Sequence, residues 1–187
     1  MNHMKFINVS AFLVALIICL LIIIFITEKS YGKILYDGES EKFNVGTELD
    51  SNGSQIYEDT TAPQTGKKHI RIILVKYIIK DKLDTRSKSS AVGYGFNNWN
   101  PIDLSKYKIL KFSAKSSLAA PVFLTMLDHN KNGDSIQIQL DSSYQNFAIP
   151  LSEFGKINFK KVTTLIFHSM LKDLPRLVID VDNIEAI

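Results

Sequence analysis

Hydrophobic and polar residues alternate along most of this chain with a period of two, the pattern of a half-buried β-strand. The segment SIQIQL is the clearest case, because Ile136, Ile138 and Leu140 share one face and Gln137 and Gln139 share the other. The alternation predicts a strand that turns its aliphatic side chains toward a core and its glutamines toward solvent.

Other segments repeat this pattern at short, fairly even spacing. The longest, His69 to Ile79, is apolar on both faces in its middle, as expected of a central strand covered on both sides. The other expected strands are 33–36, a brief strand near Ile56, 91–96, 107–114, 122–127, 144–149, 162–167 and 177–181. About nine strands with turn residues between them predict an all-β fold, an antiparallel β-sandwich of the jelly-roll type.

The N-terminal part has a different pattern. Residues 6–27 contain no charged side chain, and at about 1.5 Å per residue a helix of this length would cross a hydrocarbon core of roughly 30 Å. Lys5 favours leaving the N-terminus in the cytoplasm and exporting the rest. We expect residues 1–29 to form an uncleaved signal anchor, a transmembrane helix, with a cleaved signal peptide as the alternative. Residues 30–187 would then form one sandwich domain.

The apolar segment 6–27 determines where we expect the domain to lie and whether it can form disulfides. The domain would lie in the periplasm or outside the cell, anchored to the membrane or alternatively secreted. Cys19 is the only cysteine and lies inside the apolar segment, so the domain has no disulfide and no cysteine metal site. The large residues before Cys19 argue against a lipoprotein signal. The net charge is only +3 and is spread along the chain, which argues against nucleic-acid binding.

Several phrases resemble those of a known fold family. PIDLSKYKILKFSAKSS (residues 101–117) and YQNFAIPLSEF (144–154) are similar to strand segments of galactose-binding-like jelly rolls, which include carbohydrate-binding modules. FKKVTTLIF and VIDVDNIEAI resemble the last two strands of these domains, and ILYDGES (34–40) resembles their acidic opening. The resemblance covers residues 34–187 in the family's order and implies a carbohydrate-binding domain whose partner is an oligo- or polysaccharide.

Members of this family often bind sugar on a concave sheet lined by aromatic and polar side chains. The resemblance places Tyr77, Gln137, Gln139 and Tyr144 on that face of this chain. The two glutamines are equally what any solvated strand face would show.

A second group of candidates comes from the residues themselves. Sugar binding uses flat aromatic faces and amide groups, and Tyr94, Asn98 and Trp99 lie close together in a loop-like stretch beside two glycines. These glycines predict a bulge or a close approach by another group. The alternative for Trp99, the only tryptophan, is that it packs in the core or at its rim.

The resemblance also implies a structural calcium ion between the opening acidic segment and the last strand. Asp37, Glu39 and Asp182 match the positions of its ligands, with Asp180 as a neighbour, and calcium prefers such oxygen ligands. The alternative is an exposed turn at 37–39 and an ordinary strand end at Asp182.

The segment Asp128 to Gly133 fits the first half of an EF-hand loop. Gln139 stands where the loop requires a glutamate, and strands rather than helices flank the segment. A hairpin turn is the simpler interpretation, because Asn-Gly pairs favour tight turns.

No catalytic motif stands out in the chain. There is no G-x-S-x-G, no H-E-x-x-H and no cysteine nucleophile, and the histidines are widely spaced. We therefore expect a non-catalytic carbohydrate-binding module. The alternative is a protein-interaction or structural module that binds another protein of the cell envelope.

Overall fold

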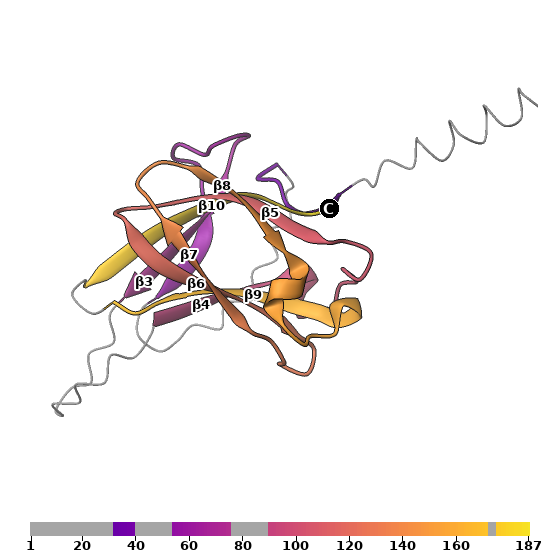
Figure 1. Cartoon of the computed structure of the whole chain (residues 1–187). Helices are drawn as coiled ribbons and strands as arrows, with labels where there is room; N and C mark the ends of the chain where they lie inside the picture. The colour runs from indigo at the N-terminus through magenta and orange to yellow at the C-terminus, as the bar shows by residue number, and fades with distance from the viewer. Residues whose placement is uncertain (1–31, 40–53, 76–89, 172–174) are drawn as a thin grey trace, which may run out of the picture. The chain divides into compact units, whose positions relative to one another are not determined.

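The protein is almost entirely β-structure, as the alternating pattern predicts (Figure 1). The structure, a computed structural model, describes residues 32–39, 54–75, 90–171 and 175–187. In these ranges the strands are β1 (Lys33–Tyr36), β2 (Gln55–Asp59), β3 (His69–Val75), β4 (Ser90–Gly95), β5 (Ile109–Ser116), β6 (Ala120–Asp128), β7 (Ser135–Leu140), β8 (Gln145–Pro150), β9 (Val162–Ser169) and β10 (Arg176–Ala186). Three short 3-10 helices join them: η1 (Phe96–Trp99), η2 (Leu151–Phe154) and η3 (Phe159–Lys161).

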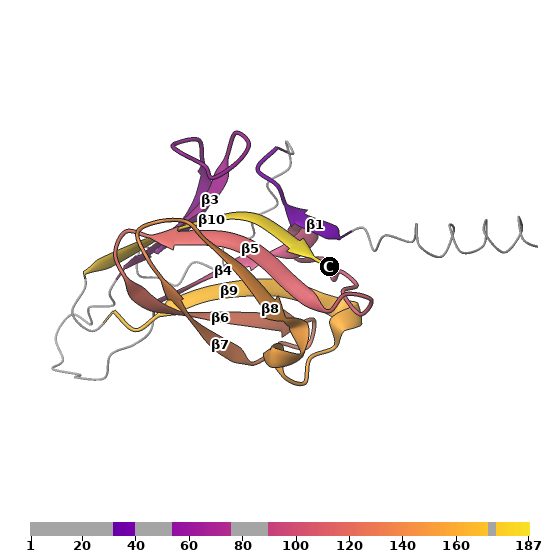
Figure 2. The same ribbon diagram turned by 45° about the horizontal axis from the view of Figure 1, so that its top comes forward.

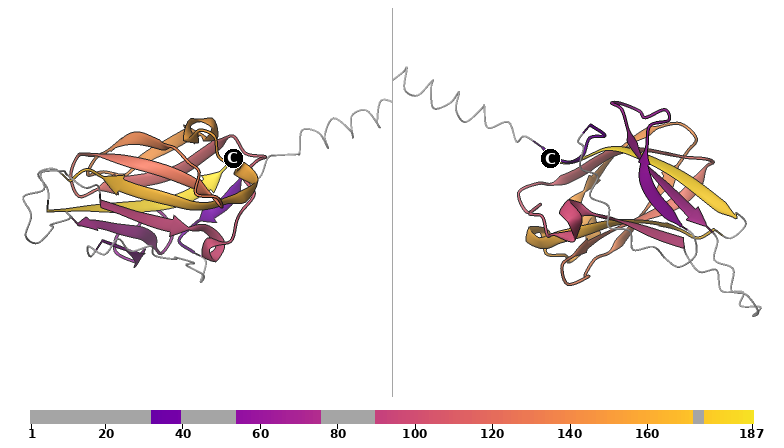
Figure 3. Two further views of the ribbon diagram at one scale, coloured as in Figure 1. Left: turned by 90° about the horizontal axis from the view of Figure 1, so that it is seen from below. Right: turned by 180° about the vertical axis from the view of Figure 1, so that it is seen from behind.

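The strands form two antiparallel sheets that pack face to face (Figures 2 and 3). The four-stranded sheet has the order β4-β9-β6-β7. The six-stranded sheet has the order β2-β3-β10-β5-β8, with β1 also paired to β10. The expected antiparallel β-sandwich is thus confirmed.

Strand β10 organises the six-stranded sheet. Its residues 176–181 pair with β3, and its last residues, 184–186, pair with β1. Between these two pairings the register against β5 shifts, and Asn183 takes a positive φ of 52°. Strand β10 continues past this β-bulge to Ala186, whereas the hydrophobic pattern predicts a strand only over residues 177–181.

The core lies between the two sheets. Phe112 of the six-stranded sheet meets Phe167 of the four-stranded sheet edge-on, with ring centroids 6.5 Å apart. Strand β3 supplies Ile70, Ile72 and Leu74, all fully buried. Burial of side chains of this size stabilises the fold by roughly 1.5–3 kcal/mol each.

The β7 strand follows its sequence pattern closely. Leu140 is fully buried and Ile136 packs against the core, whereas Gln137 and Gln139 are exposed. The pairing of Leu124 with Ile136 in the neighbouring strand places both on the core side. The predicted direction of the two glutamines is confirmed.

The segment 128–133 forms the turn between β6 and β7, as expected. The Asp128 carboxylate accepts the N–H groups of Asn130 and Asn132 at 2.8 and 3.0 Å. The positive φ falls on Lys131 (63°) rather than on the Asn-Gly pair. Gly133 is required for a different reason, since a Cβ atom there would lie 2.0 Å from the carbonyl oxygen of Met126.

The predicted membrane helix, residues 6–27, lies outside the described residues, and so does the 29/30 boundary. In the ranges that the structure describes, no helix is long and apolar enough to cross a membrane.

Candidate functional site

The four-stranded sheet has one face that is not covered by the other sheet. Strand alternation and pairing place on it every second residue of each strand, opposite to the core residues. We name this set the outer face: Ala91, Gly93, Gly95, Pro121, Phe123, Thr125, Leu127, Ser135, Gln137, Gln139, Thr164, Ile166 and His168. These strand residues include no aspartate, glutamate, lysine or arginine.

Trp99 lies on the outer face, over strand β4. A Cβ atom added to Gly95 would be 2.6 Å from the indole ring, and one added to Gly93 would be 3.7 Å from it. Val92, before the first glycine, and Tyr94, between the two glycines, are buried in the core. Because side chains alternate along a strand, the Cα–H groups of Gly93 and Gly95 face the outer side. The indole therefore rests directly on the backbone of β4, which confirms the close approach that the two glycines predicted.

The backbone of η1 brings the indole to this position. Asn97 and Trp99 both have positive φ angles, 46° and 65°. Such angles are uncommon for residues other than glycine. They turn the chain back over the edge of the sheet, where Trp99 remains partly exposed.

A second aromatic surface lies on the two central strands. The rings of Phe123 (β6) and His168 (β9) stack with centroids 5.0 Å apart and an interplanar angle of 21°. His168 Nε2 lies 3.3 Å from Thr125 Oγ1, which is 2.5 Å from Ser135 Oγ. The stacked rings thus border a row of hydroxyl groups.

Burial lowers the pKa of His168, so the ring favours its neutral form. A neutral imidazole has one donor and one acceptor nitrogen. The ring can therefore donate a hydrogen bond to a ligand hydroxyl or accept one from it.

Gln137 and Gln139 complete the outer face at its β7 edge. Gln137 pairs with Phe123 across the strands, and Gln139 pairs with Pro121. Both glutamines are exposed beside the aromatic surface, and the Gln139 amide also donates to the Leu140 carbonyl at 3.4 Å. The structure brings these two candidates together with Trp99 on one face.

Tyr94 lies elsewhere. Its side chain is 5% exposed and packs edge-on against Tyr36 and Phe96, and its hydroxyl donates to the Leu35 carbonyl at 3.1 Å. Burial raises the pKa of Tyr94 to about 12. This ring packs in the core and is not part of the outer face.

Tyr144 lies directly before strand β8 of the other sheet. The Nζ atom of Lys115 sits 4.6 Å from the centre of its ring, on the outer side of the six-stranded sheet. It therefore does not join Gln137 and Gln139, because the sandwich separates them. Tyr77 and the side chain of Asn98 lie outside what the structure describes.

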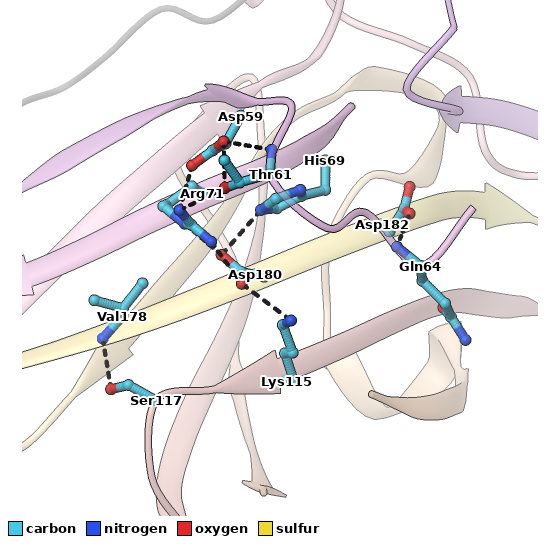
Figure 4. Close-up of polar contacts among 10 residues, drawn as sticks. All are labelled: Asp59, Thr61, Gln64, His69, Arg71, Lys115, Ser117, Val178, Asp180 and Asp182. Carbon is cyan, nitrogen blue, oxygen red and sulfur yellow. Dashed lines mark hydrogen bonds and ion pairs between the residues drawn. The ribbon is translucent and has the colours of Figure 1, made fainter. Parts of the chain in front are cut away.

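The residues expected to bind calcium gather around the loop between β2 and β3. Asp37 and Glu39 lie against it, since a Cβ atom on Gly66 would be 2.3 Å from Glu39 Oε1 and 3.5 Å from the Asp37 carbonyl oxygen. Asp182 is fully buried and faces Gln64 of the same loop (Figure 4). These candidates lie around one loop, but in the described part of the chain no group of three acidic or histidine side chains could hold a metal ion.

Three outer-face residues that carry rings or hydroxyl groups of the candidate site were not singled out from the sequence: Phe123, Thr125 and His168. The segment 122–127 reads as a plain apolar strand, and His168 reads as an edge histidine. The available signal was the alternation itself, which turns Phe123 away from the core once the register is known.

The outer face offers rings, hydroxyls and amides without charge. Flat rings can stack on the apolar faces of sugars, and neutral polar groups can bind their hydroxyls. Acid–base hydrolysis of glycosides requires a pair of carboxyl groups. The strand residues of the outer face supply none.

Comparison with known proteins identifies the family. The model of the family described as carbohydrate binding domain 30 matches residues 25–186. A search of curated protein sequences finds no match. The resemblance to carbohydrate-binding jelly rolls seen in the sequence is confirmed.

Solved structures show the same fold. A family 11 carbohydrate-binding module of the cellulosomal cellulase Lic26A-Cel5E of Clostridium thermocellum has a TM-score of 0.59 and 19% identity, over 83% of this chain and 94% of that one. The Clostridium thermocellum family 11 module in complex with a β-1,3-1,4-mixed-linked tetrasaccharide has a TM-score of 0.58 and 19% identity, over 83% and 95%.

A family 30 carbohydrate-binding module has a TM-score of 0.59 and 18% identity, over 84% of this chain and 88% of that one. At these identities the likeness shows the fold alone. The family model, however, spans the whole sandwich, and this chain therefore belongs to the carbohydrate binding domain 30 family.

Proposed function

We propose that the protein is a non-catalytic carbohydrate-binding module that binds a neutral glycan on the outer face of its four-stranded sheet. The observation that carries the proposal is the presence of three flat rings, Trp99, Phe123 and His168, on one uncharged face. The exposed amides of Gln137 and Gln139 lie at its border. Stacking would bind the sugar rings, and the amides and hydroxyls would bind their hydroxyl groups.

The spacing of the rings supports a linear, multi-unit ligand. Trp99 rests on β4, and Phe123 belongs to β6, with β9 between these strands. Two strand spacings amount to about 10 Å. One sugar unit cannot reach both surfaces, so a chain that crosses the strands would contact them through different units.

The glycan class follows from the chemistry of the face. A surface without charged strand residues offers no partner to uronic acids or sulfated sugars, which favours neutral polysaccharides. The family 11 module was solved with a β-1,3-1,4-mixed-linked tetrasaccharide. Neutral β-glucans are therefore the first ligands to test.

We retain an exported, membrane-anchored location as part of this proposal. It rests on the uncharged segment 6–27 and on Lys5 before it. A module held at the cell surface would keep a bound glycan close to the cell.

The test uses the only tryptophan of the chain as its reporter. Neutral β-glucan oligosaccharides are titrated into the purified chain, and the fluorescence of Trp99 is followed alongside calorimetry. We expect saturable binding and a spectral change. Trp99→Ala should lower the affinity roughly tenfold or more when measured by calorimetry.

The matched control is Tyr57→Ala. Tyr57 is also an exposed aromatic residue (38%), but it lies on the other sheet. Its removal should leave the affinity unchanged. Equal losses in the two variants, or no binding to any glycan by the folded protein, would contradict the proposal and favour the envelope-protein partner.

A further inference from the structure

The carboxylate of Asp182 is fully buried yet has several hydrogen-bond donors around it. Oδ2 accepts the backbone N–H groups of Gln64 and Thr65, both at 3.1 Å, and Oδ1 accepts the N–H of Asn183 at 2.9 Å. The Asn183 side chain also donates to Thr65 Oγ1 at 2.6 Å. Three of these contacts reach across more than a hundred residues and fix the β2–β3 loop to the bulge of β10.

A bound calcium ion would need the same oxygen lone pairs. Calcium takes six to eight oxygen ligands, and an N–H group that points at a carboxylate occupies a lone pair that the ion would use. At Asp182 both oxygens already accept at least one N–H group. The two loop amides therefore fill the lone pairs of Oδ2, and the Asn183 N–H takes one of the two lone pairs of Oδ1, so Asp182 keeps a single lone pair for an ion.

The neighbouring carboxylate of Asp180 is neutralised by side chains (Figure 4). Arg71 binds it in a bidentate manner, with Nε 2.7 Å from Oδ1 and Nη2 3.0 Å from Oδ2. Lys115 Nζ lies 3.7 Å from Oδ2 and His69 Nε2 lies 3.1 Å from Oδ1. Two cationic side chains, Arg71 and Lys115, and the imidazole of His69 thus surround the second carboxylate of β10.

Arg71 extends this arrangement to the edge of the sheet. Its Nη1 binds Asp59 and also donates to Thr61 at 3.1 Å. Asp59 in turn accepts the backbone N–H of Thr61 at 2.7 Å. The start of the β2–β3 loop is therefore held by the same guanidinium group that neutralises Asp180.

The acidic opening segment is also engaged. The Asp37 carboxylate accepts the N–H of Glu39 at 2.9 Å, and Glu39 faces Lys67 Nζ at 3.7 Å. These two acids lie beside the loop, while Asp182 lies beneath it with its oxygens turned to the loop amides. The described ligand candidates do not converge on one point.

We infer that the amide groups of residues 64, 65 and 183, together with Arg71 and Lys115, replace the structural calcium ion that the family resemblance implies. Asp180 and Asp182 serve as internal anchors for the β2–β3 loop. The domain then folds and keeps its stability without a divalent cation. This inference is independent of the proposed glycan site, which lies on the other sheet.

The test compares thermal unfolding of the purified full chain in EDTA and in millimolar calcium chloride, with calcium calorimetry on the same sample. We expect equal melting temperatures and no saturable heat. A structural ion at a hundred times its dissociation constant would raise the melting temperature by roughly 5 °C or more. Such a rise would overturn the inference.

Asp182→Asn tests the anchor itself. The variant replaces an oxygen by an amide N–H₂ that faces other donors, so the melting temperature should fall by several degrees, equally in both buffers. The matched control, Glu39→Gln, removes the same charge from an exposed pair and should shift it by less than about 2 °C. An unchanged melting temperature in Asp182→Asn would also overturn the inference. If the variant does not fold, the comparison of the unaltered chain in EDTA and in calcium chloride decides.

Discussion

The imidazole of His168 and the ring of Phe123 stack 5.0 Å apart on adjacent strands of the four-stranded sheet. Their register pairs them directly across the β6–β9 ladder. Because the rings face each other, each covers part of one face of the other, and the two form one aromatic cluster on the outer face.

Removing Phe123 should weaken glycan binding more than it weakens the fold. Phe123→Ala deletes one ring of the stacked pair, and we expect a roughly tenfold loss of affinity, about 1.4 kcal/mol. Calorimetry with a neutral β-glucan measures it. Phe123→Tyr keeps the ring and should retain most of the affinity, so an equal loss in both variants would argue against stacking at this position.

His168 should make stability depend on pH in mildly acidic solution. Burial lowers the pKa of His168 in the folded state, so the unfolded chain takes up its proton first. The resulting stability is present above the usual histidine pKa of about 6.5 and is lost as the pH falls through the lower folded value.

The measurement is the drop in melting temperature between pH 7.5 and pH 5, compared with the same drop in His168→Gln. The variant has no proton to take up at this position, and its drop should be smaller. Identical drops would show that the imidazole does not contribute.

Gly95→Ala should displace the indole of Trp99. The new Cβ atom would lie 2.6 Å from the ring, a distance that forces either the ring or the strand to move. We expect a shift of the tryptophan emission and a loss of glycan affinity of similar size to that of Trp99→Ala. Gly93→Ala is the milder control, since its Cβ would lie 3.7 Å from the ring and 3.2 Å from the Thr164 methyl group, which has to shift only slightly. Unchanged emission in Gly95→Ala would contradict the contact.

Arg71→Leu should destabilise the fold strongly. It leaves Asp180, which is 5% exposed, without its bidentate partner, and breaking such a buried pair costs about 3–5 kcal/mol. Urea unfolding measures the loss. Lys67→Met removes the cation of an exposed pair with Glu39 and should change stability by less than about 1 kcal/mol. A similar loss of unfolding free energy in Arg71→Leu and Lys67→Met would mean that Asp180 does not need the Arg71 guanidinium group.

Burial by itself would raise the pKa of Asp180, but its contacts with His69 and Arg71 outweigh this effect and hold the pKa well below its usual range. The stability that this carboxylate contributes is therefore present above the usual aspartate pKa of about 3.9 and is lost as the pH falls below it. Wild-type protein should lose more stability between pH 5 and pH 3 than Asp180→Asn does, as measured by urea unfolding at each pH. An equal loss would contradict the assigned direction.

The fold could be predicted because its signals are local. The alternation in β7 identifies both the strand and the direction of Gln137 and Gln139, and the glycines of β4 predict that another group comes close to the strand. Each of these signals lies within a few residues of its effect.

The site could be predicted only in part, because its remaining features depend on contacts between distant segments. Tyr94 and Trp99 are five positions apart, yet one is in the core and the other on the outer face, since the positive φ angles of η1 reverse the chain between them. Tyr144 was expected on the same face as Gln137 and Gln139 but lies directly before β8, beside Lys115 of the other sheet. Asp182 meets its donors across 117 and 118 positions, a pairing that no local pattern indicates.

The uncharged outer face has a consequence for the surroundings in which the protein can work. Dissolved ions weaken binding by screening attractions between charges. The strand residues of this face carry no aspartate, glutamate, lysine or arginine, so glycan binding there has little electrostatic attraction to lose. Capture of a neutral glycan would then proceed with similar affinity in fresh water and in brine.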